Sequence, residues 1–461
     1  MRYKYIWFTF DGIGMPVAEK LQLEGNDVII AEIQDVKELG FPDTEKPENK
    51  KKRLMGHNGM LKKIPASLVM KTLPKIKNKD EYFIIFDFNN LWFYGEQVLK
   101  MGFKNIFAPT EAQFNMERDR TKGKEFVQKH YKNIDVAEVQ EFQKVDDAVE
   151  FLQDTDDVWV LKANSDKGET FVPTSENPEF AKEMILDKLH EDQKEYELEG
   201  FILEKKIPNV KEFTPEMIFW NGKPIMTSVD IEYKHIGAGA NGSQVGCGNN
   251  LIVKVNQEDE ATKMAFPPII YEMAKKHKGL FVWDASILYS PDEDKYYFGE
   301  FCANRVGWDS FLSELAMCGG ASNFFEKIAE GENPMAFIFG VAVRGFNADK
   351  TEDALILWDK KYSDIWIYDI YKKNGKYRST GLEKDLVVFT GASNDPDEAV
   401  DKAYEALDEF AFNKMQYRPK FDFLTKDFGS SIINRYNTFN HKLWEAPDFS
   451  CDINEDNNEE E

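Results

Sequence analysis

Short apolar runs alternate with amphipathic stretches at the start of the chain. The run YKYIWFTF is followed by the glycine turn DGIGMP, the amphipathic stretch VAEKLQLEG and a second apolar run, NDVIIAEI. The same order of strand, helix and strand returns in EYFIIFDF, LWFYGEQVLKMG and KNIFAP. Buried parallel strands are short and apolar and their crossover helices are amphipathic, so the pattern predicts a Rossmann-like parallel α/β domain over residues 1–108.

The sequence pattern of residues 109–332 predicts an α+β region with shorter strands. A basic helix is predicted for ERDRTKGKEFVQKHY, strands for VWVLKAN and GFILEKK, and a helix for FAKEMILDKLHED between those strands. KEFTPEMIFWNGKPIMTSVD predicts a hairpin that turns at Asn221-Gly222, a dipeptide preferred in type I′ turns. The next segment, YKHIGAGANGSQVGCGNN, is glycine-rich and is predicted to be a loop that stays in solvent or wraps a ligand.

The last part of the chain predicts a small β-rich domain and an extension. Residues 333–425 begin with the strand AFIFGVAVRGF and include the helix DEAVDKAYEALDEFAF. Residues 426–461 form the extension, whose end, CDINEDNNEEE, is acidic and is predicted to be disordered. The fold class is therefore a multidomain mixture of α/β and α+β.

Composition excludes several classes of function. The chain has 461 residues and a formal net charge of -24, so a nucleic-acid backbone would be repelled over most of its surface. Its four cysteines show no zinc-site spacing, which favours a reduced setting. Asp11 interrupts the first apolar run, and no later run is long enough to span a bilayer. We expect a cytoplasmic protein that binds neither membranes nor nucleic acids stably.

Charged residues on the predicted strands are candidates for nucleotide chemistry. Lys162 lies on a strand and precedes a Lys167-Gly168 loop, a combination that suits phosphates. Glu204 ends a strand and is followed by Glu212 and Glu216. Carboxylates at such positions accept hydrogen bonds from ribose hydroxyls, and the alternative for each of these residues is a place on a charged surface.

The segment FGEFCANRVGWDS brings together Glu300, Asn304 and Arg305. An extended segment sends Glu300 and Asn304 to one face, and two oxygen donors on one face suit Mg²⁺. Asp284 on the preceding strand adds a second carboxylate, and a guanidinium nearby suits a phosphate. The alternative is an edge strand with solvated polar residues.

In this order the segments resemble the ATP-grasp superfamily, and within it the phosphoribosylamine–glycine ligases (glycinamide ribonucleotide synthetases). The matching segments are DGIGMPVAEKL, ERDRTKGKEFVQKHY, VWVLKANSDKGETFV, EYKHIGAGANGSQVGCGNN and VVFTGASNDPDEAVDKAYEALDEFAFNKMQYRP. The resemblance implies an ATP-grasp fold with an N-terminal Rossmann-like domain, an ATP-grasp domain over residues 109–332 and a small C-terminal domain.

The resemblance also implies roles for single residues. The implied ATP-binding residues are Arg120, Lys162, Lys167, Gly168, Glu204 and Glu212, with Glu216 the competing choice for the ribose. The implied metal ligands are Asp284, Glu300 and Asn304, and the implied catalytic residues are Arg305 and Lys234. The implied substrate-binding residues are Gly12, Gly14, Lys234, His235, Gly237 and Gly239.

The implied reaction joins a carboxylate to an amine through an acyl phosphate, with ATP and Mg²⁺ and with Mn²⁺ as the alternative metal. The family's substrates are an amino acid, glycine, and a phosphorylated amine, phosphoribosylamine, in purine biosynthesis. Two alternatives stay open: the same ligase chemistry on another amine, such as a modified nucleotide, and a non-catalytic nucleotide-binding protein. The expected assembly is a monomer or a homodimer.

Three departures from the family weaken the transfer of substrate identity. The glycine loop after Lys162 is shorter than in the family. Cys302 stands where the family has the metal-ligating asparagine, and Asn304-Arg305 come later. The C-terminal domain shows SDIWIYDIYKKNGKY in place of the family's histidine-bearing strand.

Overall fold

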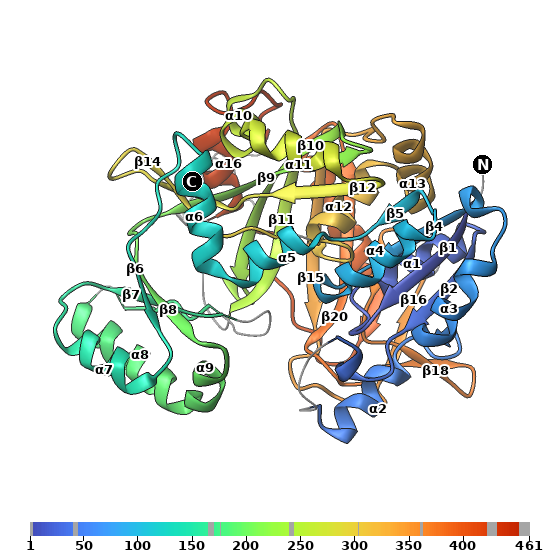
Figure 1. The fold of residues 1–461 in the computed structure, drawn as a ribbon, viewed down its shortest axis with the longest axis horizontal. Coiled ribbons are helices and arrows are strands. Elements are labelled where there is room, and N and C mark those ends of the chain that lie inside the picture. Colours follow the sequence, from blue (N-terminus) through green and yellow to red (C-terminus); the bar gives the residue numbers. More distant parts are fainter. Residues whose placement is uncertain are drawn as a thin grey trace, which may run out of the picture. The chain divides into compact units, whose positions relative to one another are not determined.

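The computed structural model describes residues 3–39, 45–164, 170–175, 177–238, 244–302, 304–359, 363–421 and 431–450. The chain divides into two compact units (Figure 1). Unit 1 comprises Met1–Glu111, Phe213–Asp284 and Cys302–Glu461, and unit 2 comprises Ala112–Glu212 and Ala285–Phe301. The division into four domains predicted from the sequence stays a prediction.

Unit 1 begins with the predicted parallel sheet. Its strands are β1 (Lys4–Thr9), β2 (Asp27–Glu32), β3 (Lys62–Pro65), β4 (Tyr82–Phe86) and β5 (Asn105–Phe107), in the order β5-β4-β1-β2-β3. The accompanying helices are α1 (Met15–Leu23), α2 (Pro47–Met55), α3 (Ala66–Thr72) and α4 (Trp92–Lys100). The strand-helix-strand pattern is thus confirmed, whereas β3 and its flanking helices were not predicted. The order reverses between β1 and β4, the position at which open α/β sheets bind ligands.

Both faces of this parallel sheet are covered, and the alternation along β1 shows it. Tyr5 and Trp7 point into one hydrophobic core, and Ile6 and Phe8 point into another on the opposite face. All four side chains are buried. A strand buried on both faces must be apolar at successive positions, which is why YKYIWFTF reads as a continuous apolar run.

The sheet continues from β5 to β12, which pairs with β5 in parallel, and then into strands that pair antiparallel. The strands are β12 (Leu280–Asp284), β9 (Lys211–Trp220), β10 (Lys223–His235), β11 (Gln244–Lys254), β15 (Phe339–Phe346), β20 (Asp385–Ser393) and β17 (Ile365–Ile367), in that spatial order. Asn221 and Gly222 have φ angles of 49° and 83°, which confirms the predicted turn between β9 and β10. The prediction of a loop over 233–250 is wrong at both ends, because β10 reaches His235 and β11 begins at Gln244.

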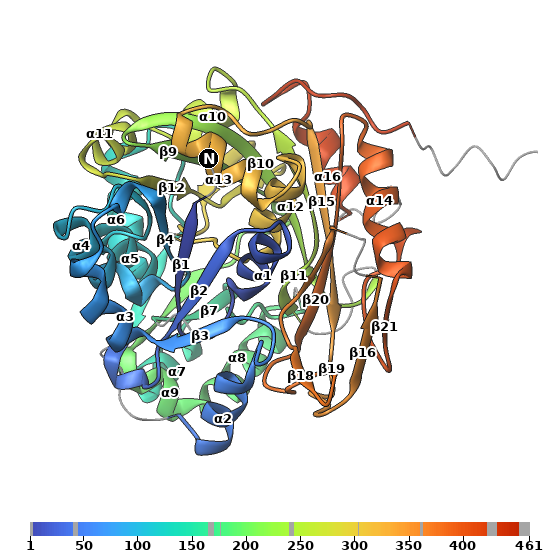
Figure 2. The ribbon, with the colours of Figure 1, turned by 90° about the vertical axis from the view of Figure 1, so that its right-hand side faces the viewer.

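A second sheet and several helices complete unit 1 (Figure 2). The sheet has the order β18 (Tyr371–Lys373), β19 (Lys376–Arg378), β16 (Leu355–Trp358) and β21 (Phe410–Phe412). The helices are α10 (Glu260–Ala265), α11 (Pro268–Lys276), α12 (Asp309–Met317), α13 (Ala321–Glu330), α14 (Pro396–Asp408) and α16 (Ile432–Phe439). Among the described residues, no helix is both long and apolar enough to cross a membrane. The predicted acidic tail over 451–461 lies outside the described residues.

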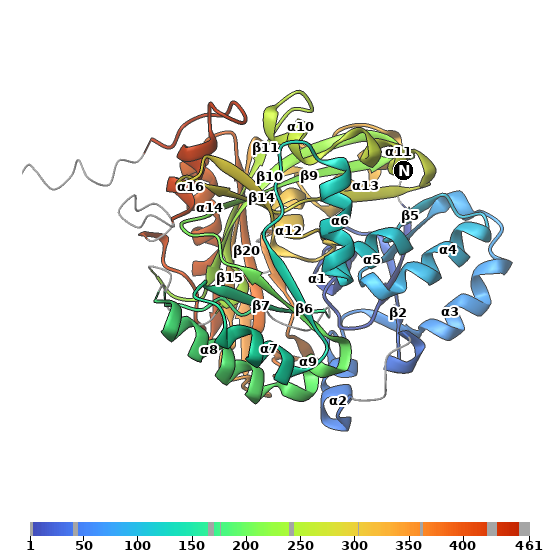
Figure 3. The same ribbon diagram turned by 60° about the vertical axis from the view of Figure 1, so that its left-hand side comes forward.

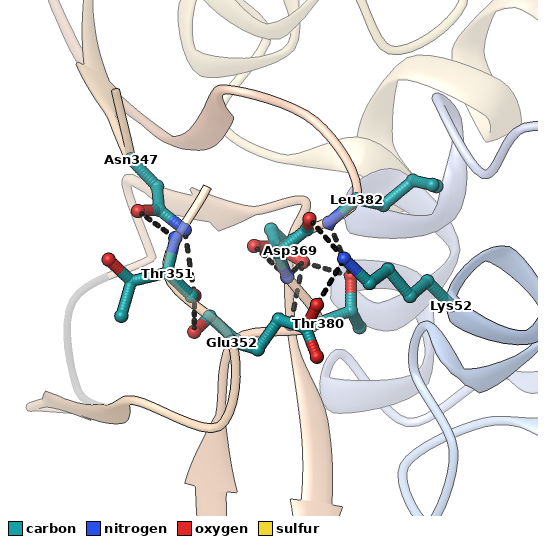
Figure 4. A network of polar contacts seen from close by, with 9 residues as sticks. Lys52, Asn347, Thr351, Glu352, Asp369, Thr380 and Leu382 are labelled. Carbon is teal, nitrogen blue, oxygen red and sulfur yellow. Dashed lines mark hydrogen bonds and ion pairs between the residues drawn. The ribbon is translucent and has the colours of Figure 1, made fainter. Parts of the chain in front are cut away.

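A buried carboxylate, Asp369, organises the loops of this region (Figure 4). Its oxygens accept hydrogen bonds from the backbone N–H groups of Thr380 at 2.8 Å and of Gly381 at 3.0 Å. Lys52 Nζ donates to Gly381 O at 3.1 Å and also pairs with Glu352. Because the carboxylate is satisfied by backbone and hydroxyl donors, we interpret this network as structural.

Unit 2 consists of a small sheet with helices packed against both of its faces. The strands are β6 (Val139–Phe142), β8 (Phe201–Lys205) and β7 (Trp159–Ala163), in that order, and a hairpin is formed by β13 (Ile287–Ser290) and β14 (Lys295–Phe298). The helices are α5 (Glu111–Arg118), α6 (Arg120–His130), α7 (Val145–Gln153), α8 (Pro178–Glu191) and α9 (Gln193–Glu199). Figure 3 shows α7, α8 and α9 gathered together beside this sheet.

Candidate active site

Strand alternation places Lys162 and Glu204 together on the face of the small sheet opposite its hydrophobic core. Trp159, Leu161 and Ala163 pack into the core with α7 and α8, so the even-numbered positions of β7 face the other way. Glu204 pairs in register with Val160, which lies two residues before Lys162 and therefore on the same face. Lys162 Nζ lies 2.7 Å from Glu204 Oε1, and both side chains are buried.

Helix α6 adds two further cations to this face. Arg120 and Lys124 are four residues apart and therefore share one side of the helix. Lys124 Nζ contacts Glu204 Oε2, and Arg120 Nη1 donates to Glu300 Oε2 at 2.9 Å. Arg120 Nε also donates to Ala163 O at 3.2 Å, which ties α6 to β7. We call Arg120, Lys124, Lys162, Glu204 and Glu300 the cation cluster.

The charges of the cation cluster perturb one another. Burial raises the pKa of Glu204, but Lys162 and Lys124 outweigh burial, so the pKa is lowered overall and the carboxylate is ionised. Burial lowers the pKa of Lys124 against the opposing attraction of Glu204, and Lys162 adds to the lowering. Three cations face two carboxylates, and an added anion such as a phosphate would remove this imbalance.

Sequence reasoning missed Lys124. The available signal was its spacing of four residues from Arg120 within a basic helix, ERDRTKGKEFVQKHY. The helix was predicted as one element, but it is two, because Asp119 starts α6 by accepting a hydrogen bond from Lys122 N at 3.1 Å. Lys122 points to solvent on the same helix, so sequence alone does not tell the buried lysine from the exposed one.

A cleft of about 670 Å³ opens in unit 2 at the residue that follows Glu204. Its walls include the chain from Lys205 to Pro208, the end of α6 and Tyr297. This size is typical of a small-ligand site, and the cleft adjoins Glu204, which was predicted to bind ATP. Glu212, the predicted ribose ligand, accepts a hydrogen bond from Ser286 Oγ at 2.6 Å.

Arg305 lies in a buried group of carboxylates in unit 1. Its Nη1 contacts Glu216 Oε1 and lies 3.3 Å from Asp284 Oδ2, and its Nη2 lies 3.6 Å from Asp230 Oδ2. These four side chains and Glu314 are at most 5% exposed. We call Arg305, Glu216, Asp230, Asp284 and Glu314 the carboxylate cluster.

Burial dominates the titration of the carboxylate cluster. It lowers the pKa of Arg305 to about 10, against the attraction of Glu314. It raises the pKa of Glu314 to about 7, although Arg305 and a 2.7 Å hydrogen bond from Ser228 Oγ favour the ionised form. One arginine does not neutralise four buried carboxylates, so at least one acid of the cluster is protonated near neutral pH.

Asn304 does not continue the strand that was predicted to carry it. Strand β14 ends at Phe298, so strand alternation does not extend to Glu300 and Asn304. Asn304 Nδ2 donates to Phe86 O at 2.6 Å, and its Oδ1 accepts from Val306 N at 3.1 Å. The amide therefore fastens this segment to the end of β4.

The donor set does not fit a divalent cation in this arrangement. Asp284 is 2% exposed, and it faces the Arg305 guanidinium while its Oδ1 accepts from Cys302 N at 2.7 Å. Within the described part of the chain, no group of three or more His, Cys, Asp or Glu side chains is placed to hold a metal ion. The assignment of Asp284, Glu300 and Asn304 to a metal stays a prediction.

In the glycine turn between β1 and α1, the backbone N–H groups donate hydrogen bonds to the protein's own side chains. Gly12 N donates to Thr9 Oγ1, Ile13 N donates to Asp11 Oδ1, and Gly14 N donates to Asp87 Oδ2, each at 3.0 to 3.1 Å. Gly14 is required because a Cβ there would lie 2.4 Å from the Trp7 indole nitrogen. Burial, with the charge of Asp11, raises the pKa of Asp87 to about 8.

The remaining predicted residues lie on the β10–β11 hairpin or outside the described residues. Lys234 and His235 end β10, and Gly237 follows them. Three predicted residues, Lys167, Gly168 and Gly239, fall outside the described residues. The roles proposed for all the site residues remain predictions.

No protein-family model and no curated protein matches this sequence, whereas its fold matches solved structures. Phosphoribosylamine–glycine ligase from Thermotoga maritima is 14% identical, with a TM-score of 0.62, over 90% of this chain and 99% of that one. Phosphoribosylglycinamide synthetase from Anaerococcus prevotii is 13% identical, with a TM-score of 0.51, over 89% and 99%. The biotin carboxylase domain of Hydrogenobacter thermophilus 2-oxoglutarate carboxylase, solved with MgADP and bicarbonate, is 12% identical, with a TM-score of 0.57, over 97% and 100%. The chain has the ATP-grasp fold, which confirms the predicted fold class.

Proposed function

We propose that this protein is an ATP-dependent ligase that joins a carboxylate to an amine through an acyl phosphate. The observation that carries the proposal is the cation cluster, in which Arg120, Lys124 and Lys162 converge on Glu204 and Glu300 within an ATP-grasp fold. The cluster holds more positive than negative charge in a largely buried position, as a nucleotide triphosphate requires.

The chain's own residues would act mainly by electrostatics. Lys124 and Lys162 are buried, so their attraction for a phosphate is screened less than that of surface lysines. Charge that develops on the transferring phosphoryl group is stabilised by cations already in place. The carboxylate attacks the γ-phosphorus of ATP, and ADP leaves. The amine then attacks the carbonyl carbon of the acyl phosphate, so that the C–N bond forms, the C–O bond to phosphate breaks, and phosphate and a proton are released. No side-chain nucleophile is needed in this scheme.

ATP and Mg²⁺ enter the proposal through the fold, since one structural neighbour was solved with MgADP. When bound, Mg²⁺ neutralises phosphate charge. Glu300 is the predicted ligand best placed to meet it, because its side chain is 40% exposed. Asp284 would first have to leave Arg305, so no step of the scheme depends on the metal.

Glycine and phosphoribosylamine are the first substrate pair to test, because a neighbour carries the name of that ligase. A second candidate is an amine without phosphate. It is favoured by the turn at Gly12–Gly14, where Asp11 and Asp87 occupy the N–H groups that would otherwise meet a phosphate.

The test measures ADP release with Mg-ATP, glycine and phosphoribosylamine, beside a panel of other amino acids and amines. Lys124→Met is expected to weaken ATP binding by about tenfold or more, since one charge-assisted contact is lost. Lys122→Met is the matched control: it lies on the same helix, its side chain is 62% exposed, and its effect should stay within about twofold.

ATP binding without ADP release for any substrate pair would support a non-catalytic nucleotide-binding protein. Equal behaviour of the Lys124 and Lys122 variants would contradict the placement of ATP at the cation cluster.

A further inference from the structure

A buried arginine of unit 1, Arg418, forms hydrogen bonds to the end of β10 that carries Lys234 and His235. Its side chain is fully buried, although it lies far along the chain after β21. Arg418 Nη1 donates to His235 O at 2.9 Å and also to Gly237 O. The guanidinium lies over the Tyr233 ring, 3.4 Å from its centre. One side chain thus contacts the backbone on both sides of the end of β10.

The opposite strand of the hairpin approaches the same point at Gly248. Tyr233 pairs with Asn249, but His235 pairs with Gln244, so the register breaks here and β11 carries the additional residues. A Cβ at Gly248 would lie 2.7 Å from His235 O and 3.0 Å from Arg418 Cδ. A glycine at this position lets β11, β10 and the arginine meet.

Arg418 is itself held in place by its backbone. Its carbonyl oxygen accepts a hydrogen bond from Tyr404 OH at 2.8 Å, and Tyr404 lies on α14. A guanidinium presents several donors in a fixed plane, so it fixes two carbonyl groups and a ring at once, which a lysine cannot do. The contacts constrain the backbone conformation from Tyr233 to Gly237.

We infer that Arg418 is a positioning residue for the amine acceptor. It sets the backbone at the end of β10 so that Lys234 and His235 are presented to this substrate, while ATP binding does not depend on it. The inference rests on the proposed function and on the substrate-binding role that the family resemblance implies for Lys234 and His235. It adds a residue that touches neither ATP nor acceptor but controls the KM for one of them.

The first test compares Arg418→Met and Arg418→Lys with Arg435→Met. Arg435 is a matched control, since it also donates to a β10 carbonyl, Glu232 O, and lies 5.7 Å from the Tyr233 ring, but it does not hold His235 or Gly237 in the described contacts. Steady-state kinetics use the acceptor that gives turnover with the wild type. In Arg418→Met, kcat/KM for the acceptor should fall by about twentyfold or more, while the KM for ATP stays within about twofold.

Arg418→Lys should restore part of this loss, and Arg435→Met should resemble the wild type. Equal losses for ATP and acceptor, or equal effects of the two arginine variants, would overturn the inference. If Arg418→Met does not fold, Gly248→Ala disturbs the same junction from the other strand and should show the same selective loss.

Hydrogen–deuterium exchange separates this inference from the proposed function. Arg418→Met should speed exchange at residues 233–238 and 244–249 and leave unit 2 unchanged, whether or not an acceptor is known. Absence of ADP release by the wild type with every amine would count against the proposed function. Unchanged exchange in the variant would overturn the positioning role of Arg418 in either case.

Discussion

In unit 2, three cationic side chains surround Glu204 and Glu300, whereas in unit 1 four carboxyl groups surround Arg305. Both groups are placed by strands of a sheet, by one helix and by one segment outside the helices and strands, and most of their members are buried. They differ in the sign of the charge that is left over. An added anion stabilises the cation cluster, whereas protonation or the positive charge of Arg305 stabilises the carboxylate cluster.

This difference separates a binding role from a structural one. Lys124 and Lys162 both pair with the same carboxylate, that of Glu204. A phosphate that approaches the two lysines therefore adds a second anion to which both can bind. Arg305 already forms ion pairs with Glu216 and Asp284, so a phosphate would have to compete with two buried carboxylates. The catalytic role predicted for Arg305 therefore needs a rearrangement that the role of Lys162 does not.

Removal of Arg305 should have the largest effect on stability. Arg305→Met leaves Glu216, Asp230 and Asp284 without their cation, and the loss of one partner from a buried ion pair costs about 3–5 kcal/mol. Urea denaturation of the variant and the wild type measures the difference. A loss below about 1 kcal/mol would mean that the cluster is not the structural element inferred from it.

The pH dependence of stability should show the next largest effect. The pKa of Glu314 is raised from 4.5 to about 7, so its protonated form stabilises the fold fully below pH 4.5, and this contribution is lost as pH rises through 7. A shift of this size corresponds to about 3 kcal/mol. His57 acts with the opposite sign, because burial lowers its pKa to about 3 and its contribution is lost as pH falls below 6.5.

The difference between wild type and Glu314→Gln isolates this contribution, because His57 is present in both proteins. The free energy of unfolding of the wild type, relative to the variant, should fall between pH 4.5 and pH 7 and stay level above that range. A flat difference would show that Glu314 is ionised throughout, with its charge neutralised by Arg305.

The sequence predicted single elements better than the partners of their side chains. The apolar run YKYIWFTF and the Asn221-Gly222 turn are local signals, and the structure confirms the strand and the turn that they predicted. The environment of Arg305 depends instead on Glu216 and Asp284, which the antiparallel pairing of β9 and β12 brings opposite each other. The register of these strands is set by the packing of the whole sheet, so it cannot be predicted from the segment that carries Arg305.

Asn304 is a case in which the spacing of two residues in the sequence did not predict the contacts of their side chains. Its spacing from Glu300 favoured a shared metal, but the spacing has this meaning only in an extended strand, and β14 ends at Phe298. Lys124 was missed because a helix surface pattern does not show which lysine meets a buried glutamate. Both cases concern contacts between residues that lie far apart in the sequence.

The smallest expected effect on stability is that of Glu300→Gln, and it sharpens the comparison with Arg305. The Glu300 side chain is 40% exposed and pairs with Arg120, so solvent screens the pair and the free energy of unfolding should change by less than about 0.5 kcal/mol. Urea denaturation without added metal checks this value. The same measurement with Mg-ATP then tests the binding role: if Glu300 meets the metal, Mg-ATP should stabilise the wild type more than the variant, because an amide is a weaker ligand for a hard cation. Equal stabilisation of both proteins by Mg-ATP would remove Glu300 from the metal assignment and leave it as the partner of Arg120.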